Sequence, residues 1–339
     1  MRTRFAIVGY GHIGRRHAAI VHAHPGAELA AVCEIGALST ESLPANVPVY
    51  DDLSRMLAER VFDVACICTP NGLHAAQAVA CLEAGRHVII EKPLALTVAD
   101  CDRIIATAAA RDRRVFGVMQ NRYSPASVWL KELMEAGRLG DVLQVHVNCF
   151  WNRDGRYYGA GNERHSWHGH RELDGGVLFT QFAHFVDLLC WTFGAVEVIA
   201  ARAANQTHRA YHDFPDSGMV HFRLPGGGFG SMNYSTVIYG TNFESTLSVI
   251  GSRGTVKLGG QYMNEVRYCH VADVAVPDLP RAAPPNDYGG YQGSAANHHH
   301  VIDNAIRVLR GEAEVATPAT EGREVVRFIT EVHRMSEPV

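Results

Sequence analysis

Apolar runs alternate with amphipathic segments along the first 120 residues. Short, almost continuous apolar runs, typical of strands buried on both faces, occur at Phe5–Val8, Glu28–Cys33, Phe62–Cys68, His87–Ile90 and Val115–Met119. Between them, apolar residues recur at helical spacing over residues 13–21, 51–60, 73–84 and 98–111. Strands that alternate with helices predict an α/β fold with a doubly wound parallel sheet.

The pattern changes after residue 122. Val142–Trp151 alternates apolar and polar side chains, which is typical of a half-buried strand. Antiparallel strands are predicted at Val196–Asn205, Gly218–Leu224, Phe229–Ile238, Ser245–Ile250, Thr255–Leu258 and Val266–Val271. Helices are predicted at 125–137, 176–193, 295–310 and 320–335, with a loop at 277–293. We therefore expect two domains, 1–122 and 123–339, the second an α+β domain with a large, mostly antiparallel open sheet and closing helices that pack back on the body.

Three glycines, Gly9, Gly11 and Gly14, follow the first strand with the spacing GxGxxG and open a helix. A tight turn, a close approach to a pyrophosphate and close packing of helix on strand each require a residue without a side chain. Glu34 lies twenty residues beyond Gly14, after the second strand, where a carboxylate can bind the adenosine ribose and repel a 2′-phosphate. The pattern predicts a Rossmann domain that binds NAD rather than NADP, with His12 and Ile13 in the same loop.

Composition narrows the class of protein. The 339 residues are 47% hydrophobic and 19% charged, with a net charge of −4, so no basic surface for nucleic acid is expected. The eight cysteines are scattered without a CxxC pair, as in reduced cytosolic proteins. The N-terminus runs directly into the first strand without a secretory signal, and no run reaches the roughly 18 apolar residues of a membrane span. We expect a cytoplasmic protein without a membrane partner.

Lys92 is the first candidate for chemistry. Lysine occurs at only three positions of this arginine-rich chain, and Lys92 lies where a strand ends and a proline follows. A lysine in a half-buried cleft can shift its pKa, whereas arginine stays charged. Thr69–Asn71 and Gln120–Arg122 also follow strands, and ligands of doubly wound sheets bind at these ends. The alternative is a lysine that forms an ordinary salt bridge at a strand end.

The predicted helix over Gly176–Phe193 supplies the second candidate. Thr180, His184 and Asp187 follow one another at helical spacing, with Gln181 beside them, while Leu178, Phe182, Phe185 and Leu189 form the apolar stripe. One helix would thus present a histidine and several polar groups to a cleft. The alternative interpretation is a histidine packed in the core.

Taken together, these segments resemble the glucose–fructose oxidoreductase/inositol dehydrogenase/MocA (GFO/IDH/MocA) family. The resemblance rests on GxGxxG with Glu34, on Thr69-Pro70-Asn71 followed by His74, on Glu91-Lys92-Pro93 and on the Gly-Gly…His…Asp helix. It implies that Lys92 and His184 lie against the substrate hydroxyl next to the nicotinamide. The cofactor contacts that it implies are Gly9, Gly11, His12, Ile13, Gly14, Glu34, Thr69, Pro70, Asn71, His74, Glu91, Lys92 and Gln120. The open sheet would form the interface of a homo-oligomer, a dimer or a tetramer.

Further segments resemble the nucleotide-sugar 3-dehydrogenase branch of that family. They are Gln120–Tyr123, Cys149–Arg153, Trp167–Gly169, Leu173–Gly176, Asn242–Ser245, Gly259–Met263 and Gly293–His298. Such enzymes oxidise C3 of UDP-N-acetylglucosamine, or of its C6 acid, ahead of a 3-aminotransferase in the synthesis of surface polysaccharide and lipid A sugars. The expected substrate contacts are Asn121, Arg122, Tyr123, Trp151, Arg153, Asp174, Thr180, Gln181, His184, Asn297 and His298.

The chain departs from the family pattern at one position. Many members have aspartate four residues before the helix histidine, where this chain has Thr180. Asp187 or Asp174 could replace that carboxylate, or Lys92 alone could tune the base. His184 is the preferred base because a neutral imidazole suits neutral pH, and Lys92 would then stabilise the developing negative charge, although the reverse assignment is open.

The sequence leaves three alternative functions to consider. Histidines at 165, 168, 170 and 298–300 could suggest a zinc hydrolase, but their spacing matches no zinc signature, so we expect no metal. A sensor that only binds NAD would need the glycine loop but neither Lys92 nor His184. The alternative among enzymes is a dehydrogenase or ketoreductase of a free polyol such as inositol, or of a dTDP-sugar.

Overall fold

The computed structural model describes residues 2–36, 43–44, 46–159, 167–276, 278–280 and 295–336. The chain divides into two compact units, 1–118 with 298–326 and 119–297 with 327–339. The predicted division assigned all of 123–339 to the second domain, whereas here the segment 298–326 belongs to the first unit. Most of the loop predicted over 277–293 lies outside the described residues.

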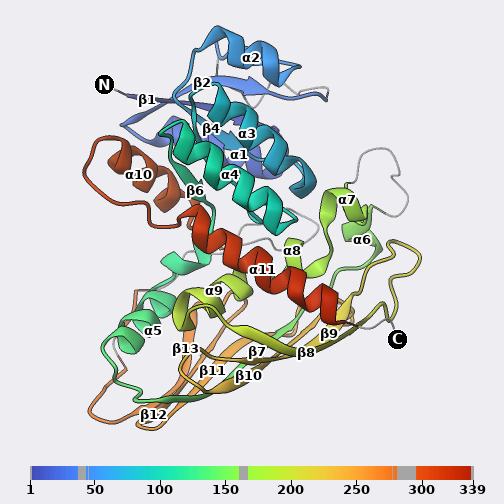
Figure 1. Ribbon diagram of the computed structural model, residues 1–339, viewed down its shortest axis with the longest axis vertical. Helices are drawn as coiled ribbons and strands as arrows, with labels where there is room; N and C mark the ends of the chain where they lie inside the picture. The colour runs from blue at the N-terminus through green and yellow to red at the C-terminus, as the bar shows by residue number, and fades with distance from the viewer. Residues whose placement is uncertain are drawn as a thin grey trace. The chain divides into compact units, whose positions relative to one another are not determined.

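The first unit is built on a six-stranded parallel sheet, which confirms the predicted Rossmann fold (Figure 1). Its order is β3-β2-β1-β4-β5-β6. The strands are β1 (Thr3–Val8), β2 (Ala27–Cys33), β3 (Val49–Tyr50), β4 (Val64–Ile67), β5 (His87–Ile90) and β6 (Val115–Gly117). The two-residue β3 is too short for a sequence pattern to predict. Because β4 is buried at all four positions, it shows the continuous apolar run of a strand covered on both faces.

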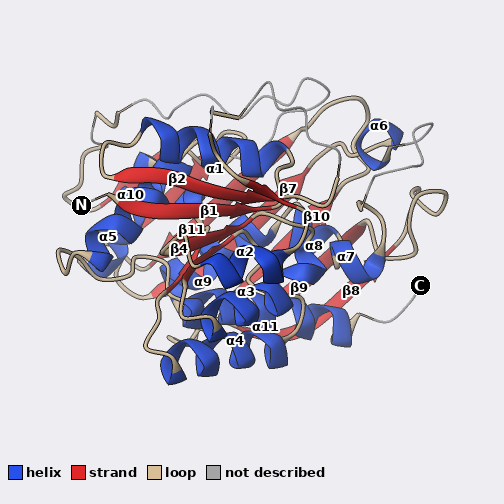
Figure 2. Cartoon of the chain, turned by 90° about the horizontal axis from the view of Figure 1, so that it is seen from above, coloured by secondary structure: helices blue, strands red, loops and turns tan. Residues whose placement is uncertain are grey.

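Helices cover both faces of this sheet. The helices α1 (His12–Ala23) and α10 (His298–Leu309) pack against each other on one face, and α3 (His74–Glu83) and α4 (Val98–Ala110) lie side by side on the other (Figure 2). The short α2 (Leu53–Glu59) precedes β4. The returning segment is also tied to β6, because Gly117 N donates to Thr317 O at 2.8 Å and the Thr317 hydroxyl donates to Gly117 O at 2.6 Å. The C-terminal segment therefore completes the Rossmann layer.

The second unit contains a seven-stranded sheet with the order β13-β12-β11-β7-β10-β9-β8. Every neighbouring pair is antiparallel except β7 with β10, which confirms the predicted mostly antiparallel sheet. The strands are β7 (Val142–Phe150), β8 (Glu197–Ala204), β9 (Ser217–Arg223), β10 (Phe229–Ser235), β11 (Glu244–Gly251), β12 (Gly254–Gly259) and β13 (Glu265–Val271).

One face of this sheet is covered and the other is open. Val145, Val147 and Cys149 of β7 are buried, as their alternation predicts. The helices α5 (Pro125–Glu135), α9 (Ala183–Phe193) and the second half of α11 (Ala319–Met335) lie on one side of the sheet (Figure 1). On the opposite face Met219, Phe229 and Tyr268 are 63%, 56% and 52% exposed. Three large apolar side chains thus remain uncovered on the open face.

The prediction of a single helix over Gly176–Phe193 is wrong, because the structure has two helices there. α8 (Val177–Thr180), which follows the short α7 (Arg171–Asp174), and α9 are separated by a 53° bend. Phe182 N bonds to Val177 O, five residues back, and the regular ladder restarts with Phe182 O as acceptor. Thr180 therefore precedes the bend and does not share a helical stripe with His184, whereas Asp187 does.

All eight cysteines are in the thiol form, and all but Cys269 are buried, as predicted for reduced core residues. Within the described ranges no single helix is long and apolar enough to cross a membrane. Residues 171–180 and 183–193 meet that test only as a bent pair, and the residues of α8 and α9 are almost all buried in the second unit.

Candidate cofactor and catalytic sites

The glycine loop after β1 has the geometry of a phosphate cradle. Gly9 has a φ of +86°, and a Cβ there would lie 2.8 Å from Thr69 Cγ2; a Cβ on Gly14 would lie 1.9 Å from Gly9 O. A Cβ on Gly11 would meet no atom within 4 Å. Gly11 is also the N-cap of α1 and supplies no capping side chain, so the first amides of the helix face this space. The loop fits the pyrophosphate of NAD.

Glu34 lies beside the same loop. Its Oε2 accepts a hydrogen bond from Tyr10 N at 2.6 Å, and its Oε1 accepts one from Gly36 N at 2.9 Å. The side chain is only half-buried, so the carboxylate keeps acceptor capacity for a ligand. This is the place and chemistry that a ribose diol requires.

His74 connects two loops at the carboxyl edge of the parallel sheet. Its Nδ1 lies 2.7 Å from Pro93 O and its Nε2 lies 2.9 Å from Thr69 O, and the side chain is completely buried. Burial lowers the pKa of His74. Both ring nitrogens thus face main-chain carbonyls, and the contact of His74 with the cofactor stays a prediction. His74 fixes the loops that carry Thr69, Pro70 and Asn71 on one side and Lys92 on the other.

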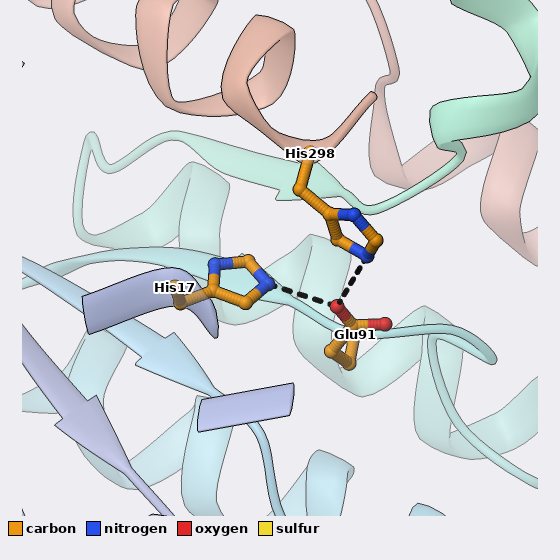
Figure 3. Close-up of side chains that lie close together, drawn as sticks. All are labelled: His17, Glu91 and His298. Atoms are coloured by element: carbon orange, nitrogen blue, oxygen red, sulfur yellow. Dashed lines mark hydrogen bonds and ion pairs between the residues drawn. The ribbon is translucent and has the colours of Figure 1, made fainter. Parts of the chain in front are cut away.

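Glu91 and His298 lie in a closed cluster with His17 (Figure 3). Glu91 Oε1 is 2.8 Å from His17 Nε2 and 3.6 Å from His298 Nε2, while its Oε2 accepts a hydrogen bond from the main-chain amide of Lys92 at 3.2 Å. The exposed fractions of the three side chains are close to zero. The sequence predicts Glu91 as a cofactor contact and His298 as a substrate contact, but the structure gives both internal partners.

Burial and hydrogen bonding set the charges of this cluster. Burial alone raises the pKa of Glu91, but the hydrogen bond from His17, followed by the electrostatic effects of His298, His17 and Lys92, outweighs it and holds the pKa at about 2. Burial lowers the pKa of His298 to about 3. At neutral pH the cluster therefore holds a carboxylate beside a neutral His298. His17 is not among the site residues predicted from the sequence, although its place on the apolar stripe of α1 marks it as a buried histidine.

His184 is held at the start of α9 in the second unit. It is 4% exposed, and its Nε2 lies 3.2 Å from the side-chain amide nitrogen of Gln120 in the 3₁₀ helix η3 (Gln120–Tyr123). The Asn297 amide donates to Gln120 O and to the Ser124 hydroxyl, both at 3.2 Å. Ser124 is the N-cap residue of α5, and its side chain makes no capping hydrogen bond. The structure therefore brings together three predicted residues: Gln120, His184 and Asn297.

The carboxylates considered as partners of His184 have other principal partners. Asp187 forms a two-point ion pair with Arg122, in which Arg122 Nε lies 2.7 Å from Asp187 Oδ2 and a second bond joins Nη2 to Oδ1. Both side chains are buried. The Thr180 hydroxyl donates to the Asp174 carboxylate and, at 3.0 Å, to Asp174 O. Arg122, predicted as a substrate contact, thus anchors η3 to α9.

Each of the two units contains a segment that matches a known protein family. A family profile for the oxidoreductase family with an NAD-binding Rossmann fold matches residues 3–118, and one for the GFO/IDH/MocA C-terminal domain matches residues 128–257. The WlbA dehydrogenase from Bordetella pertussis, solved with NADH and UDP-GlcNAcA, is 32% identical with a TM-score of 0.87, over 99% of this chain and 97% of that one. The chain belongs to the GFO/IDH/MocA family.

Two further similar proteins align with different shares of this chain. The WlbA dehydrogenase from Chromobacterium violaceum, also solved with NADH and UDP-GlcNAcA, is 32% identical over 99% of this chain and 94% of that one, with a TM-score of 0.87. Inositol 2-dehydrogenase of Salmonella typhimurium is 32% identical over 166 residues, 47% of each chain. The chain thus spans about half the length of the curated relatives it matches.

In this GFO/IDH/MocA protein, Trp151 and Arg153 support the loop that follows β7. The Trp151 indole donates to the Ser245 hydroxyl at 2.8 Å, and its ring packs on Phe182 and Phe185. The Arg153 guanidinium lies 4.7 Å from the Trp151 ring centre. Trp151 and Arg153 are each 4% exposed and have internal partners, and their contact with the substrate stays a prediction.

Tyr157, in the short helix α6 (Gly155–Tyr158) that follows this loop, was not predicted as a site residue from the sequence. Its hydroxyl accepts a hydrogen bond from the Gln181 amide at 2.8 Å, and the Arg153 guanidinium lies 5.3 Å from its ring centre. It therefore joins the loop after β7 to the bend before α9. No motif in the sequence pointed to it, because the contact depends on the bend at Phe182.

Several buried amide groups of the second unit have no hydrogen-bond partner among the described residues. They are Gln120 Oε1, Gln181 Oε1 and both polar atoms of the Asn121 side chain. Buried amides cost free energy unless they are bonded, and hydroxyl groups complement them. Tyr123, the remaining residue of η3, is half-buried.

A cavity of about 490 Å³ lies near the ends of β11 and β12. Residues from two of the family-like segments, 242–245 and 259–263, line it together with Trp151, Lys257 and Arg267. His184 is not among the lining residues, and Trp151 packs between the cavity and α9.

Proposed function

We propose that this protein is an NAD-dependent dehydrogenase that oxidises the C3 hydroxyl of a UDP-N-acetylhexosamine to the 3-keto sugar. The substrate would be UDP-GlcNAc or its C6 acid, UDP-GlcNAcA. The observation that carries the proposal is the likeness to two WlbA dehydrogenases, each solved with NADH and UDP-GlcNAcA, at 32% identity over 99% of the chain. A 3-aminotransferase would use the product in the synthesis of surface polysaccharide or lipid A sugars.

His184 and Lys92 carry the proposed chemistry. His184 takes the proton of the C3 hydroxyl, because a neutral imidazole is a competent base near neutral pH. The Gln120 side-chain amide contacts the ring at Nε2, and its oxygen has to face Nε2–H so that the lone pair of Nδ1 takes the proton. The Lys92 ammonium binds the same oxygen and stabilises the negative charge that develops on it. Bound NAD supplies the hydride acceptor.

The groups around His184 support a sugar substrate. The unsatisfied amides of Gln120, Asn121 and Gln181 are acceptors and donors for hydroxyl and acetamido groups. On the cofactor side, the open space at Gly11 and the carboxylate of Glu34 suit a pyrophosphate and a ribose diol. The chain therefore carries polar groups that complement a dinucleotide and polar groups that complement a polyhydroxylated substrate.

The test is the appearance of NADH absorbance when purified protein and NAD are mixed with UDP-GlcNAc, UDP-GlcNAcA or myo-inositol. A 3-aminotransferase is added to draw the equilibrium towards product. We expect a signal with one UDP-sugar, which also identifies the group at C6. A signal with myo-inositol alone contradicts the nucleotide-sugar assignment and supports the second candidate below.

Replacement of either proposed catalytic residue tests the mechanism. Lys92→Ala or His184→Ala should lower turnover by roughly 10²–10⁴-fold, because each removes a group that acts on the reacting oxygen. NADH affinity, measured by fluorescence, should change little. Lys131→Ala is the matched control, since Lys131 bonds to Trp191 O on α9 and to Glu135. Unchanged turnover in Lys92→Ala would refute the proposed role.

A second candidate function is oxidation of a free polyol such as inositol. It is favoured by the curated inositol 2-dehydrogenases, which are 32% identical over about half of this chain. The same two residues would act on a ring hydroxyl. The substrate panel above separates the two candidates.

We also propose that the protein forms a homo-oligomer, a dimer or a tetramer, through the open face of the second sheet. The uncovered Met219, Phe229 and Tyr268 support this, since large apolar side chains that are exposed on one sheet face favour burial by a second copy. Sedimentation of Phe229→Lys against the unchanged protein tests it. A variant with unaltered mass would contradict the assignment.

A further inference from the structure

The cluster of His17, Glu91 and His298 has no reacting role in the proposed mechanism, yet it is almost fully enclosed. Figure 3 shows the Glu91 carboxylate between the two imidazoles. The exposed fractions of the side chains are 0% for His17, 8% for Glu91 and 1% for His298. A buried carboxylate costs free energy unless its neighbours compensate its charge, so we looked for a role that explains why Glu91 is buried here.

Glu91 joins α1 to the main chain of Lys92. One carboxylate oxygen is bonded to His17 Nε2 at 2.8 Å, and the other accepts the Lys92 amide at 3.2 Å. Because the carboxylate is ionised at neutral pH, these bonds are charge-assisted and stronger than neutral ones. The Glu91 side chain alone therefore links the main chain of Lys92, at the end of β5, to α1.

His298 closes the cluster from α10. Its Nε2 lies 3.6 Å from Glu91 Oε1, and its ring meets that of His17 edge to face with centroids 5.6 Å apart. The preceding residue, Asn297, belongs to the second unit. Its amide donates to Ser124 and to the main-chain oxygen of Gln120, the residue whose side chain contacts His184. Two consecutive residues thus anchor the segments of Lys92 and of His184, each within its own unit.

A metal ion is the competing explanation of this cluster, because one ligand atom of each residue lies within 4.8 Å of the others. The 2.8 Å between His17 Nε2 and Glu91 Oε1 is a hydrogen-bond distance. It is shorter than the roughly 3.3 Å expected between two ligands of a tetrahedral zinc ion. Among the described residues no fourth ligand joins the group, and its enclosure leaves little room for water. The geometry favours a hydrogen-bonded cluster.

We propose that His17 and His298 are positioning residues that fix Lys92 by holding the Glu91 carboxylate. The role of Lys92 rests on the proposed function, but the claim that the cluster fixes Lys92 does not. His17 acts through a hydrogen bond, and His298 acts by confining the carboxylate and keeping it from water.

The three lysines of the chain allow a test that does not depend on activity. Purified protein is treated briefly with limiting acetic anhydride, and the acetylation rates of Lys92, Lys131 and Lys257 are measured by mass spectrometry. In His17→Leu and His298→Leu we expect the rate at Lys92 to rise roughly threefold or more, because its segment opens more often. The rates at Lys131 and Lys257 should stay constant. His17→Gln, whose amide can donate from a similar place, should restore the original rate.

His299→Leu is the matched control, since His299 is exposed on the same helix, one residue further on. It should leave all three rates unchanged. An unchanged rate at Lys92 in both cluster variants overturns the proposal, and so does a parallel rise at all three lysines, which would mean general loosening. Stoichiometric metal in the purified protein that is lost in His298→Leu overturns it in favour of a metal site.

Activity provides the second arm. His298→Leu should lower turnover roughly ten- to hundredfold in the otherwise unchanged enzyme, because small misplacements of a catalytic group are costly. In a Lys92→Met background the same substitution should cost almost nothing, since its effect acts through Lys92. An equal loss in both backgrounds contradicts the positioning role. If the unchanged protein reduces no NAD with any sugar, the proposed function fails, while the labelling result still decides the positioning claim.

Discussion

The glycines of the loop after β1 have different neighbours, so substitutions of them separate folding from cofactor binding. In Gly14→Ala the new Cβ would overlap Gly9 O at 1.9 Å, so we expect destabilisation by about 3 kcal/mol or more. In Gly11→Ala the Cβ meets no protein atom within 4 Å, and its φ of −68° suits alanine.

Gly11→Ala should therefore keep the melting temperature but weaken NAD binding by roughly tenfold or more, about 1.4 kcal/mol. Thermal denaturation and NADH fluorescence titration check the pair. Equal NAD affinity in Gly11→Ala and the unchanged protein would show that the space at the helix N-terminus is not the pyrophosphate site.

At the residue scale, the sequence could predict groups whose role is written in local spacing. Gly11, Glu34 and Lys92 each follow a strand, and a strand end is visible as a change from apolar to polar residues. The partners of Glu91 and Asp187 could not be predicted, because His17 and Arg122 lie 74 and 65 residues away in the chain. Only the folded sheet brings such pairs together.

The ion pair between η3 and α9 is the element-scale contact with the largest expected effect. Removal of one partner from a buried pair leaves an uncompensated charge, so Asp187→Ala should lower the free energy of unfolding by about 3–5 kcal/mol. Arg122→Met with Asp187→Leu should cost less, because no charge remains buried. Chemical denaturation measures both.

The matched control for this ion pair is Glu331→Ala. It breaks the pair with Arg334 on α11, in which the Arg334 side chain is 65% exposed, and it should change stability by less than about 1 kcal/mol. Similar losses in Asp187→Ala and Glu331→Ala would contradict the view that the buried pair holds η3 on α9.

The same helix shows why element boundaries escape sequence reasoning. Leu178, Phe182, Phe185 and Leu189 fit one helical stripe, and all are buried, yet the hydrogen-bond ladder breaks at Phe182. Nothing in the local sequence forces that break, since it contains neither glycine nor proline between 177 and 193. Burial was thus predictable from periodicity, whereas the bend depends on what the two pieces pack against.

At the scale of the whole molecule, fully and partly buried histidines govern the response to acid. Burial lowers the pKa of His298 to about 3 and those of His87, His212 and His333 to about 4. An unfolded chain protonates histidine near pH 6.5, so between pH 6.5 and 4 the unfolded state binds more protons. Stability should therefore fall as the pH drops through this range.

We expect the melting temperature to decrease steadily from pH 7 to pH 5, before most carboxylates titrate. Between pH 7 and pH 8 the histidine contribution should be flat. Scanning calorimetry over a pH series tests this expectation. A melting temperature that is constant between pH 7 and pH 5 would contradict the neutral, buried state of these imidazoles.

The return of residues 298–326 to the first unit constrains how the protein is made. During synthesis α1 emerges early, but α10, whose Val301, Ile302 and Ile306 are buried, follows only after residues 119–297. At typical elongation rates of about 5–20 residues per second, that interval lasts roughly 10 to 40 s. The nascent nucleotide-binding layer must therefore wait on the ribosome with an uncovered apolar face, which makes it a natural client for chaperones until the last part of the chain emerges.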